Sequence, residues 1–256
     1  MKNRLQSVLT TKEGKLTAIY CTAGFPQLQD TLTVIEGLDE ADADIIEIGI
    51  PFSDPLADGE VIQQSGQQAL ENGMTLEILF QQLEKVRTIT QKPLVLMGYY
   101  NTILQYGEER FVNQCKKVGI DGVILPDVPL EVYEQELEQL MKENDLSMIF
   151  LIAPETSNDR ICKIDYLSSS FIYLVSHSGT TGISTITSFN NSYFQRVASL
   201  ALQHPILVGF GIHNKDSFSK ATHYAKGGIV GSAFIQHIQQ NGISKQVIAD
   251  FVNDLK

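Results

Sequence analysis

The sequence is poor in cysteine, and it has no apolar run close to the ~20 residues that a membrane-spanning helix needs. Its three cysteines, Cys21, Cys115 and Cys162, are scattered and share no motif. This pattern argues against a disulfide framework or a zinc cluster and is typical of a reducing compartment. The first residues also lack the apolar segment of a secretory signal. These absences predict a cytoplasmic protein that makes no use of a membrane.

Basic residues are scarce as well: 19 Lys and Arg stand against 30 Asp and Glu, for a formal net charge of -11. An acidic surface disfavours nucleic acid as a partner, and any site for a phosphorylated ligand must be built locally. The five histidines show no HExxH or zinc spacing, so no metal site is expected. The nucleotide-binding pattern GxxxxGK[ST] is absent, and no lysine lies in an apolar run where it could form a Schiff base.

What the sequence does contain is an alternation of short apolar runs with longer amphipathic stretches. Because parallel strands covered on both faces read as continuous apolar runs, we interpret the runs as strands of a parallel sheet. They lie at 16–22, 44–50, 93–100, 122–126, 148–153, 171–176, 206–211 and 227–235. Helical stretches are expected at 29–41, 60–71, 75–90, 108–118, 131–143, 158–166, 189–203, 214–225 and 243–255.

Eight such units in 256 residues predict an α/β fold, a (β/α)8 TIM barrel that occupies residues 1–256 as a single domain. Residues 3–10 are expected to form an extra N-terminal helix that closes the barrel bottom. A doubly wound open sheet is the competing arrangement. In a barrel, the irregular stretches 51–60 and 176–190, which follow strands, would be loops of the catalytic face.

A single acid, Glu47, lies among aliphatic residues in the second apolar run. A carboxyl group inside a barrel is costly unless it is paired, protonated or used, and burial raises its pKa toward the range of a general acid and base. The structural alternative is an ion pair or a helix cap. Asp58 follows eleven residues later, in a proline-stiffened loop that also holds Asp54. Either aspartate could cap the next helix; proximity to Glu47 favours a functional role for Asp58.

Three late segments combine glycine with hydroxyl residues, at 176–182, 209–212 and 231–233. Glycine lets backbone N–H groups approach an anion, and the third segment opens into a short helix whose dipole favours negative charge. Barrels often bind phosphate after strands seven and eight. The segments hold no lysine or arginine, so the backbone would bind a phosphate monoester; plain turn glycines are the alternative.

Several motifs together resemble the tryptophan synthase alpha subunit family. They are YCTAGFP (20–26), EIGIPFSDPLADG (47–59), LPDVPLE (125–131), YLVSHSGTTG (173–182), GFGI (209–212) and GSAFI (231–235), in order along nearly the whole chain. The resemblance implies a barrel lyase of L-tryptophan biosynthesis. It would cleave indole-3-glycerol phosphate to indole and glyceraldehyde 3-phosphate by acid–base retro-aldol chemistry, without a metal or cofactor of its own.

The same resemblance assigns roles to residues. It places the catalytic pair at Glu47 and Asp58 and the partner interface at Asp54. The substrate-binding positions that it implies are Tyr20, Tyr173, Thr181, Gly182, Gly211, Gly231 and Ser232. The implied partner is a β subunit that carries pyridoxal phosphate, in an assembly of two α and two β chains. Indole-3-glycerol phosphate synthase and a purely activating subunit are the alternative functions.

The sequence departs from the family pattern in loops that close the site or meet the partner. His177 stands where the family often has arginine, and Phe25 where it often has aspartate. The helix after Asp58 also begins GEVIQQ in place of the more common GPTIQ. The cleavage chemistry does not depend on these positions, whereas communication with the β subunit does.

Overall fold

The computed structural model describes residues 3–176 and 191–256, and in it the strands form one parallel sheet curled into a barrel. The hydrogen-bonded order is β5-β4-β3-β2-β1-β9-β8-β7-β6. The strands are β1 (Leu16–Thr22), β2 (Ile45–Gly49), β3 (Leu94–Met97), β4 (Gly122–Ile124), β5 (Ser147–Ile149), β6 (Leu151–Ile152), β7 (Ile172–Val175), β8 (Ile206–Gly209) and β9 (Gly227–Val230). This order confirms the predicted barrel and not the open sheet.

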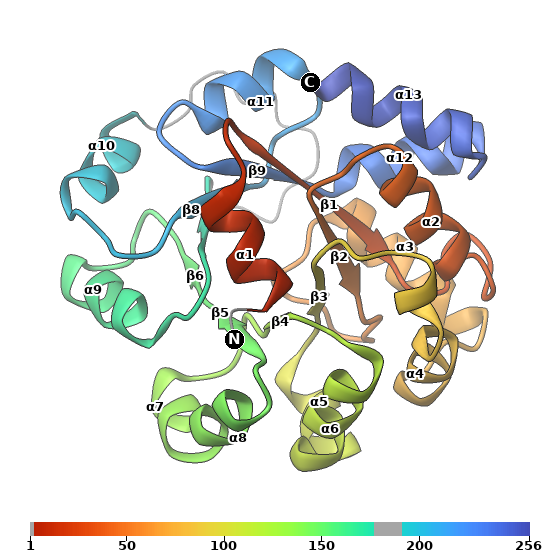
Figure 1. The fold of residues 1–256 in the computed structure, drawn as a ribbon, viewed down its shortest axis with the longest axis horizontal. Helices are drawn as coiled ribbons and strands as arrows, with labels where there is room; N and C mark the ends of the chain where they lie inside the picture. The colour runs from red at the N-terminus through yellow and green to blue at the C-terminus, as the bar shows by residue number, and fades with distance from the viewer. Residues whose placement is uncertain (1–2, 177–190) are drawn as a thin grey trace.

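Helices surround the strands, as Figure 1 shows. Their apolar faces cover the outer side of the sheet, and the strand residues are almost all buried. The helices are α1 (Arg4–Thr11), α2 (Thr31–Glu40), α3 (Glu60–Glu71), α4 (Leu76–Leu83), α5 (Tyr100–Tyr106), α6 (Glu108–Val118), α7 (Leu130–Val132), α8 (Glu138–Glu143), α9 (Asn158–Leu167), α10 (Asn191–Ser199), α11 (Lys215–Thr222), α12 (Ser232–Asn241) and α13 (Lys245–Leu255). None of these described helices has the length and apolarity to cross a membrane.

The fifth predicted strand is divided in two at Phe150. Residues 147–149 pair with β4, whereas residues 151–152 pair with β7. The Phe150 carbonyl accepts a hydrogen bond from the Tyr173 N–H group at 2.9 Å, so the chain changes its pairing partner at this residue. The eight predicted strands therefore account for nine observed segments, and the division marks where the barrel closes.

Two other predicted runs were too long. The run 93–100 ends as a strand at Met97, and a helix that was not predicted, α5, begins at Tyr100. The run 227–235 ends as a strand at Val230, because Phe234 and Ile235 lie on α12 and pack into the core from a helix. In both places apolar or aromatic residues continue past the end of the strand, Tyr99 and Tyr100 in the first and Ala233 to Ile235 in the second, so the apolar pattern alone does not mark the boundary.

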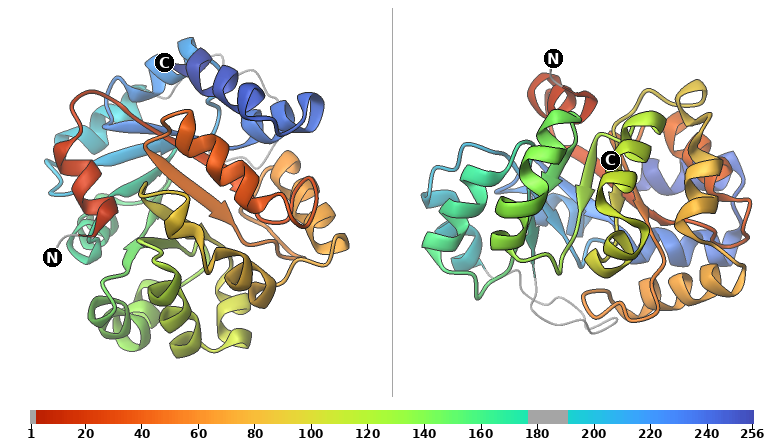
Figure 2. Two further views of the ribbon diagram at one scale, coloured as in Figure 1. Left: turned by 45° about the vertical axis from the view of Figure 1, so that its right-hand side comes forward. Right: turned by 90° about the horizontal axis from the view of Figure 1, so that it is seen from below.

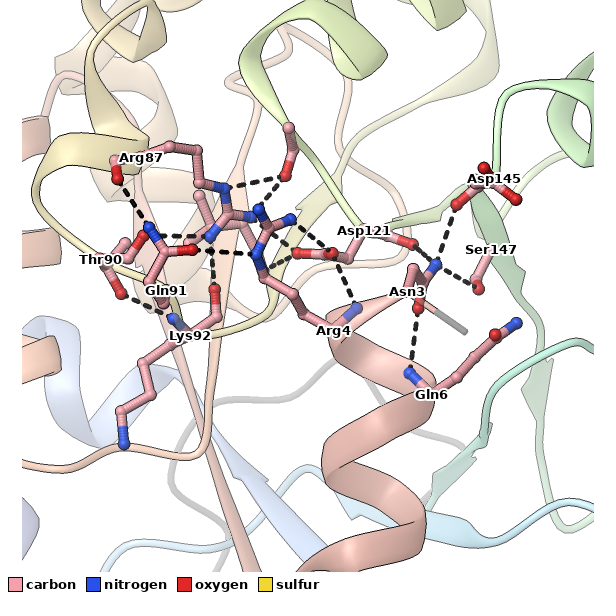
Figure 3. Close-up of polar contacts among 12 residues, drawn as sticks. Asn3, Arg4, Gln6, Arg87, Thr90, Gln91, Lys92, Asp121, Asp145 and Ser147 are labelled. Atoms are coloured by element: carbon pink, nitrogen blue, oxygen red, sulfur yellow. Dashed lines mark hydrogen bonds and ion pairs between the residues drawn. The ribbon is translucent and has the colours of Figure 1, made fainter. Parts of the chain in front are cut away.

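Helix α1 lies across one mouth of the barrel, as predicted, and the side view in Figure 2 places it at one end of the molecule. Asp121, 2% exposed and immediately before β4, anchors this end. Its carboxylate accepts hydrogen bonds from Arg87 Nη2 at 2.7 Å, from the Leu94 N–H group at 3.0 Å and from Arg4 (Figure 3). Its backbone carbonyl accepts one from Asn3 Nδ2 at 2.9 Å. A single buried carboxylate thus joins α1 to β3 and β4.

We expect Asp121→Ala to lower the free energy of unfolding by about 3–5 kcal/mol, because it leaves the largely buried Arg87 guanidinium without its counter-charge. Urea unfolding followed by circular dichroism measures the change. Arg4→Ala is the control: the Arg4 side chain is 40% exposed, and its ion pair with Asp121 should contribute about 1 kcal/mol or less. Similar losses in the two variants would contradict the central role of Asp121.

Candidate active site

Glu47 lies in the middle of β2, between two buried isoleucines, and is 2% exposed. Its register partners are Tyr20 on β1 and Val95 on β3. Within the described part of the chain, no lysine, arginine or histidine pairs with its carboxyl group, so the predicted structural alternative of an ion pair is not found. Burial, followed by the nearby charge of Asp58, raises the pKa of Glu47 to about 8. At neutral pH this side chain is therefore mainly a neutral acid.

Asp58 lies at the end of the loop that joins β2 to α3, and it is half-buried. Burial raises the pKa of Asp58 to about 6, although a hydrogen bond from Tyr99 opposes this rise. The residue that caps α3 is Gly59, and no side chain caps this helix. The structure therefore leaves Asp58 and Asp54 without the capping role that the sequence allowed.

Tyr99 fixes the position of the Asp58 loop, and sequence reasoning did not assign it that role. Its hydroxyl donates a hydrogen bond to Asp58 Oδ2 at 3.1 Å and accepts one from the Ala57 N–H group at 2.9 Å. Its ring stacks on Phe52, with the ring centroids 5.0 Å apart. One side chain at the start of α5 thus holds both ends of the loop and sets where the Asp58 carboxylate lies.

Tyr20 and Tyr173 are buried in the wall of the barrel, 7% and 5% exposed. Burial raises the pKa of each hydroxyl well above its ordinary value, and the charges of Glu47 and Asp58 add to the rise in both. The two carboxyl groups therefore lie close enough to both rings to act on them electrostatically. The sequence-predicted residues Tyr20, Glu47, Asp58 and Tyr173 converge on one site.

Each tyrosine ring lies over a glycine of the next strand. A Cβ atom on Gly49 would come within 1.9 Å of the Tyr20 hydroxyl, and one on Gly209 within 2.0 Å of the Tyr173 hydroxyl. Only glycine leaves room for these rings, so Gly49 and Gly209 shape the site without contacting it through side chains. Sequence reasoning missed this role of both glycines. The signal that could have found them is a glycine at the end of a strand whose neighbouring strand carries a tyrosine.

The late glycines lie where a phosphate site was predicted. Gly211 follows β8 with a φ of +75°, which favours glycine. Gly231 caps α12, no side chain accepts from the first N–H groups of that helix, and Ser232 is its first residue and exposed. These N–H groups, together with the helix dipole, can bind an anion. The predicted residues Thr181 and Gly182, and the departure at His177, lie outside the described residues.

Two further predictions concern single residues. Asp54 lies exposed in the β2–α3 loop, where its carboxylate accepts a hydrogen bond from Ser53 Oγ at 2.5 Å. Phe25 is 2% exposed and packs in the core, so the aromatic residue at this departure from the family pattern has an internal packing role.

Among the described residues, no group of histidine, cysteine and acidic side chains could hold a metal ion.

The fold is that of a parallel barrel enzyme, with one buried carboxyl group in the wall whose raised pKa favours its neutral form and a second acid in the loop that follows the same strand, two groups that can supply acid–base chemistry. Comparison with known proteins specifies the class. The family model of the tryptophan synthase alpha chain matches residues 6–254. The chain is 47% identical to the tryptophan synthase alpha chain of Flavobacterium psychrophilum, over 99% of both chains. It is 48% identical to that of Christiangramia forsetii, over 99% of this chain and 98% of the relative.

Solved structures agree with these relatives. The tryptophan synthase A-subunit of Pyrococcus furiosus superimposes with a TM-score of 0.84 at 34% identity, over 95% of this chain and 98% of that one. An aminoacrylate-bound tryptophan synthase from M. tuberculosis gives a TM-score of 0.85 at 26% identity, over 99% and 98%. The chain belongs to the tryptophan synthase alpha chain family. It is an alpha subunit of tryptophan biosynthesis, a lyase that cleaves indole-3-glycerol phosphate.

Proposed function

We propose that Glu47 and Asp58 together catalyse the cleavage of indole-3-glycerol phosphate into indole and glyceraldehyde 3-phosphate, without a cofactor bound to this chain. The observation that carries the proposal is the pair itself. One carboxyl group is held neutral by burial, and the other is held at the loop above it by Tyr99. Two acids in different environments can hold opposite protonation states at one pH.

In the proposed mechanism the neutral Glu47 carboxyl group donates its proton to C3 of the indole ring. Positive charge then develops on the ring nitrogen, where the Asp58 carboxylate stabilises it. The Glu47 carboxylate next accepts the proton of the glycerol hydroxyl on the carbon attached to C3. That oxygen forms the carbonyl of glyceraldehyde 3-phosphate, the carbon–carbon bond breaks, and its electron pair returns to the ring. Indole leaves, and Glu47 is again a neutral acid.

The rest of the site would bind the two ends of the substrate. Tyr20 and Tyr173 supply flat apolar walls for the indole ring. Gly211, Gly231 and Ser232, together with Thr181 and Gly182, which lie outside the described residues, would hold the phosphate through neutral donors. None of the described strands contains a lysine, which disfavours the ring-forming synthase as the alternative enzyme.

The β2–α3 loop is the proposed contact with a β subunit that carries pyridoxal phosphate. Leu56, at its tip, is 84% exposed, next to the exposed Asp54. Both side chains are therefore accessible to a partner, and Leu56 is a large apolar side chain that a partner could cover. Tryptophan synthase from Pyrococcus furiosus has been solved as a complex. We infer an assembly of two α and two β chains in the cytoplasm. Because the same loop carries Asp58, partner binding would act directly on the catalytic carboxylate.

The pair predicts a bell-shaped dependence of kcat/KM on pH for indole release. Asp58 must be ionised, and its pKa of about 6 sets the acid limb; Glu47 must be protonated, and its pKa of about 8 sets the alkaline limb. Activity should therefore rise through pH 6 and fall through pH 8. Steady-state assays of free indole measure both limbs. The two apparent pKa values describe the carboxyl pair together and not each residue alone.

One variant separates the limbs. Tyr99→Phe removes the hydrogen bond that lowers the pKa of Asp58, so the acid limb should move to higher pH while the alkaline limb stays near its position. A rate independent of pH between about 5 and 9 would show that neither carboxyl group titrates in the reaction.

A further inference from the structure

The two residues that follow β8 both adopt the left-handed backbone conformation. Phe210 has a φ of +71° and Gly211 a φ of +75°. Glycine adopts this region freely, but a bulky aromatic residue does so only where its surroundings enforce it. Phe210 therefore marks a strained backbone at the end of a strand, a feature that clusters at ligand sites.

Three contacts enforce the conformation. Ser176 Oγ, at the end of β7, donates a hydrogen bond to the Phe210 carbonyl oxygen at 2.9 Å. His213 Nδ1 lies 3.1 Å from the Gly211 carbonyl oxygen. A carbonyl oxygen can only accept, so Nδ1 carries the proton. The Phe210 ring packs edge-on against Tyr173, with the centroids 6.3 Å apart. The backbone of this turn is thus held from the neighbouring strand, from the following residues and from the indole pocket.

His213 is itself firmly placed. Its N–H group donates to Ser217 Oγ at 3.0 Å, and the next residue, Asn214, caps α11 with a reciprocal pair of hydrogen bonds. The imidazole is exposed, but the backbone that carries it is anchored to a helix. A hydrogen bond from such a base can hold Gly211 in one orientation.

These contacts leave the N–H groups of Gly211 and Ile212 as the polar groups of the turn that a ligand could bind. Both carbonyls of the strained pair are occupied, whereas the N–H groups of Gly211 and Ile212 have no acceptor in residues 3–176 and 191–256. Gly211 is exposed, so its N–H group is open to a ligand. A turn whose carbonyls are occupied and whose N–H groups have no acceptor among the described residues presents hydrogen-bond donors to an incoming group, which suits an anion.

We propose that His213 and Ser176 are positioning residues that hold the Phe210–Gly211 turn in a phosphate-binding conformation, and that they set the preference of the enzyme for a phosphorylated substrate. The inference rests on the proposed function, because it assumes that the phosphate lies at this turn. His213 acts through the backbone: its Nδ1–H group holds the Gly211 carbonyl, and the Gly211 and Ile212 N–H groups bind the phosphate oxygens.

The test compares two variants of the exposed His213. Asparagine places an amide N–H group close to the position of Nδ1, whereas leucine places a methyl group there. For His213→Leu we expect KM for indole-3-glycerol phosphate to rise roughly five- to tenfold with a much smaller change in kcat, as the loss of one hydrogen bond implies. The dissociation constant of glycerol 3-phosphate, from isothermal titration calorimetry, should rise by the same factor. His213→Asn should stay within about threefold of the wild type.

Indole and a second histidine supply the controls. Binding of indole, which carries no phosphate, should be unchanged in both variants. His204→Ala alters a histidine that precedes the same strand at its other end and hydrogen-bonds Asp165, so it should leave glycerol 3-phosphate binding unchanged.

The outcomes distinguish the phosphate site itself from the role of His213 in it. A wild-type chain that does not bind glycerol 3-phosphate would overturn the phosphate site of the proposed function. A wild-type chain that binds it, with His213→Leu equally tight, would overturn the role of His213 alone. If asparagine were as damaging as leucine, the imidazole would act by its charge and not by holding Gly211, and the proposal would be wrong.

Discussion

Glu47→Gln should lower kcat for indole release by about 10²–10⁴-fold while the protein remains folded. The amide keeps the shape of the side chain but can neither donate the proton to C3 nor accept the one from the glycerol hydroxyl. Glu47 is buried in β2 and mainly neutral at pH 7, so replacing it by a neutral amide costs little packing. The measurement is single-turnover formation of free indole, with substrate binding determined separately.

The same variant should also change how the stability of the protein depends on pH. The pKa of Glu47 is about 8 in the folded chain and near its ordinary 4.5 when unfolded, so the folded state binds the proton more tightly. Stability contributed by this group is present below pH 4.5 and lost as pH rises through 8. Glutamine does not titrate, so the Tm of Glu47→Gln should exceed that of the wild type increasingly across this range.

A buried carboxylate just before the same strand provides the control. Asp44, which precedes β2, is paired with Lys12 at 2.5 Å and lies at the opposite end of the barrel from Asp58. Asp44→Asn should reduce stability and leave kcat near the wild-type value. The assignment of Glu47 fails if Glu47→Gln retains more than about a tenth of wild-type turnover, a loss smaller than acid–base catalysis supplies.

The second large effect is expected for Asp58→Asn, which should lower kcat by about 10²–10³-fold. Asparagine still accepts the hydrogen bond from the Tyr99 hydroxyl, so the loop keeps its position, but the negative charge that stabilises the protonated indole ring is lost. Pre-steady-state assays with indole-3-glycerol phosphate measure the effect on the chemical step.

The control removes a different charge from the same face. Asp127 follows β4 and accepts a hydrogen bond from the Tyr100 N–H group at 2.9 Å, which asparagine can also accept. Asp127→Asn should cleave the substrate at a rate within about threefold of the wild type, as expected of a surface substitution away from special features. Equal losses in Asp58→Asn and Asp127→Asn would mean that a general negative potential, and not the placed Asp58 carboxylate, matters.

Much of this architecture was predictable from sequence, because continuous apolar runs that alternate with amphipathic stretches indicate a parallel sheet covered by helices, and eight such units favoured a barrel over an open sheet. The same principle found Glu47, since a single acid within an aliphatic strand needs an explanation. What the pattern could not give was the point at which an apolar strand becomes an apolar helix. After the strand that ends at Met97, Tyr99 and Tyr100 continue the run of large hydrophobic side chains, although Tyr100 already begins a helix.

The site was less predictable than the fold, because the residues that position Asp58 and the tyrosine rings contact them from segments far apart in the chain. Tyr99 and Asp58 are 41 residues apart, and nothing in either segment indicates their hydrogen bond. The same is true of Gly209, which leaves space for a ring on another strand. Ser176 and Phe210, 34 residues apart, are a third such pair.

The pairing of β1 with β9 has a consequence for synthesis of the protein. Leu16 aligns with Gly227, so the edge of the first strand stays unpaired until more than 200 further residues have left the ribosome. The apolar edge of β1, with its unpaired backbone N–H and C=O groups, therefore stays exposed through most of translation. Such edges can pair with other chains. Chains released before β9 should therefore aggregate rather than fold into a smaller sheet, and recombinant yield should depend on chaperone supply.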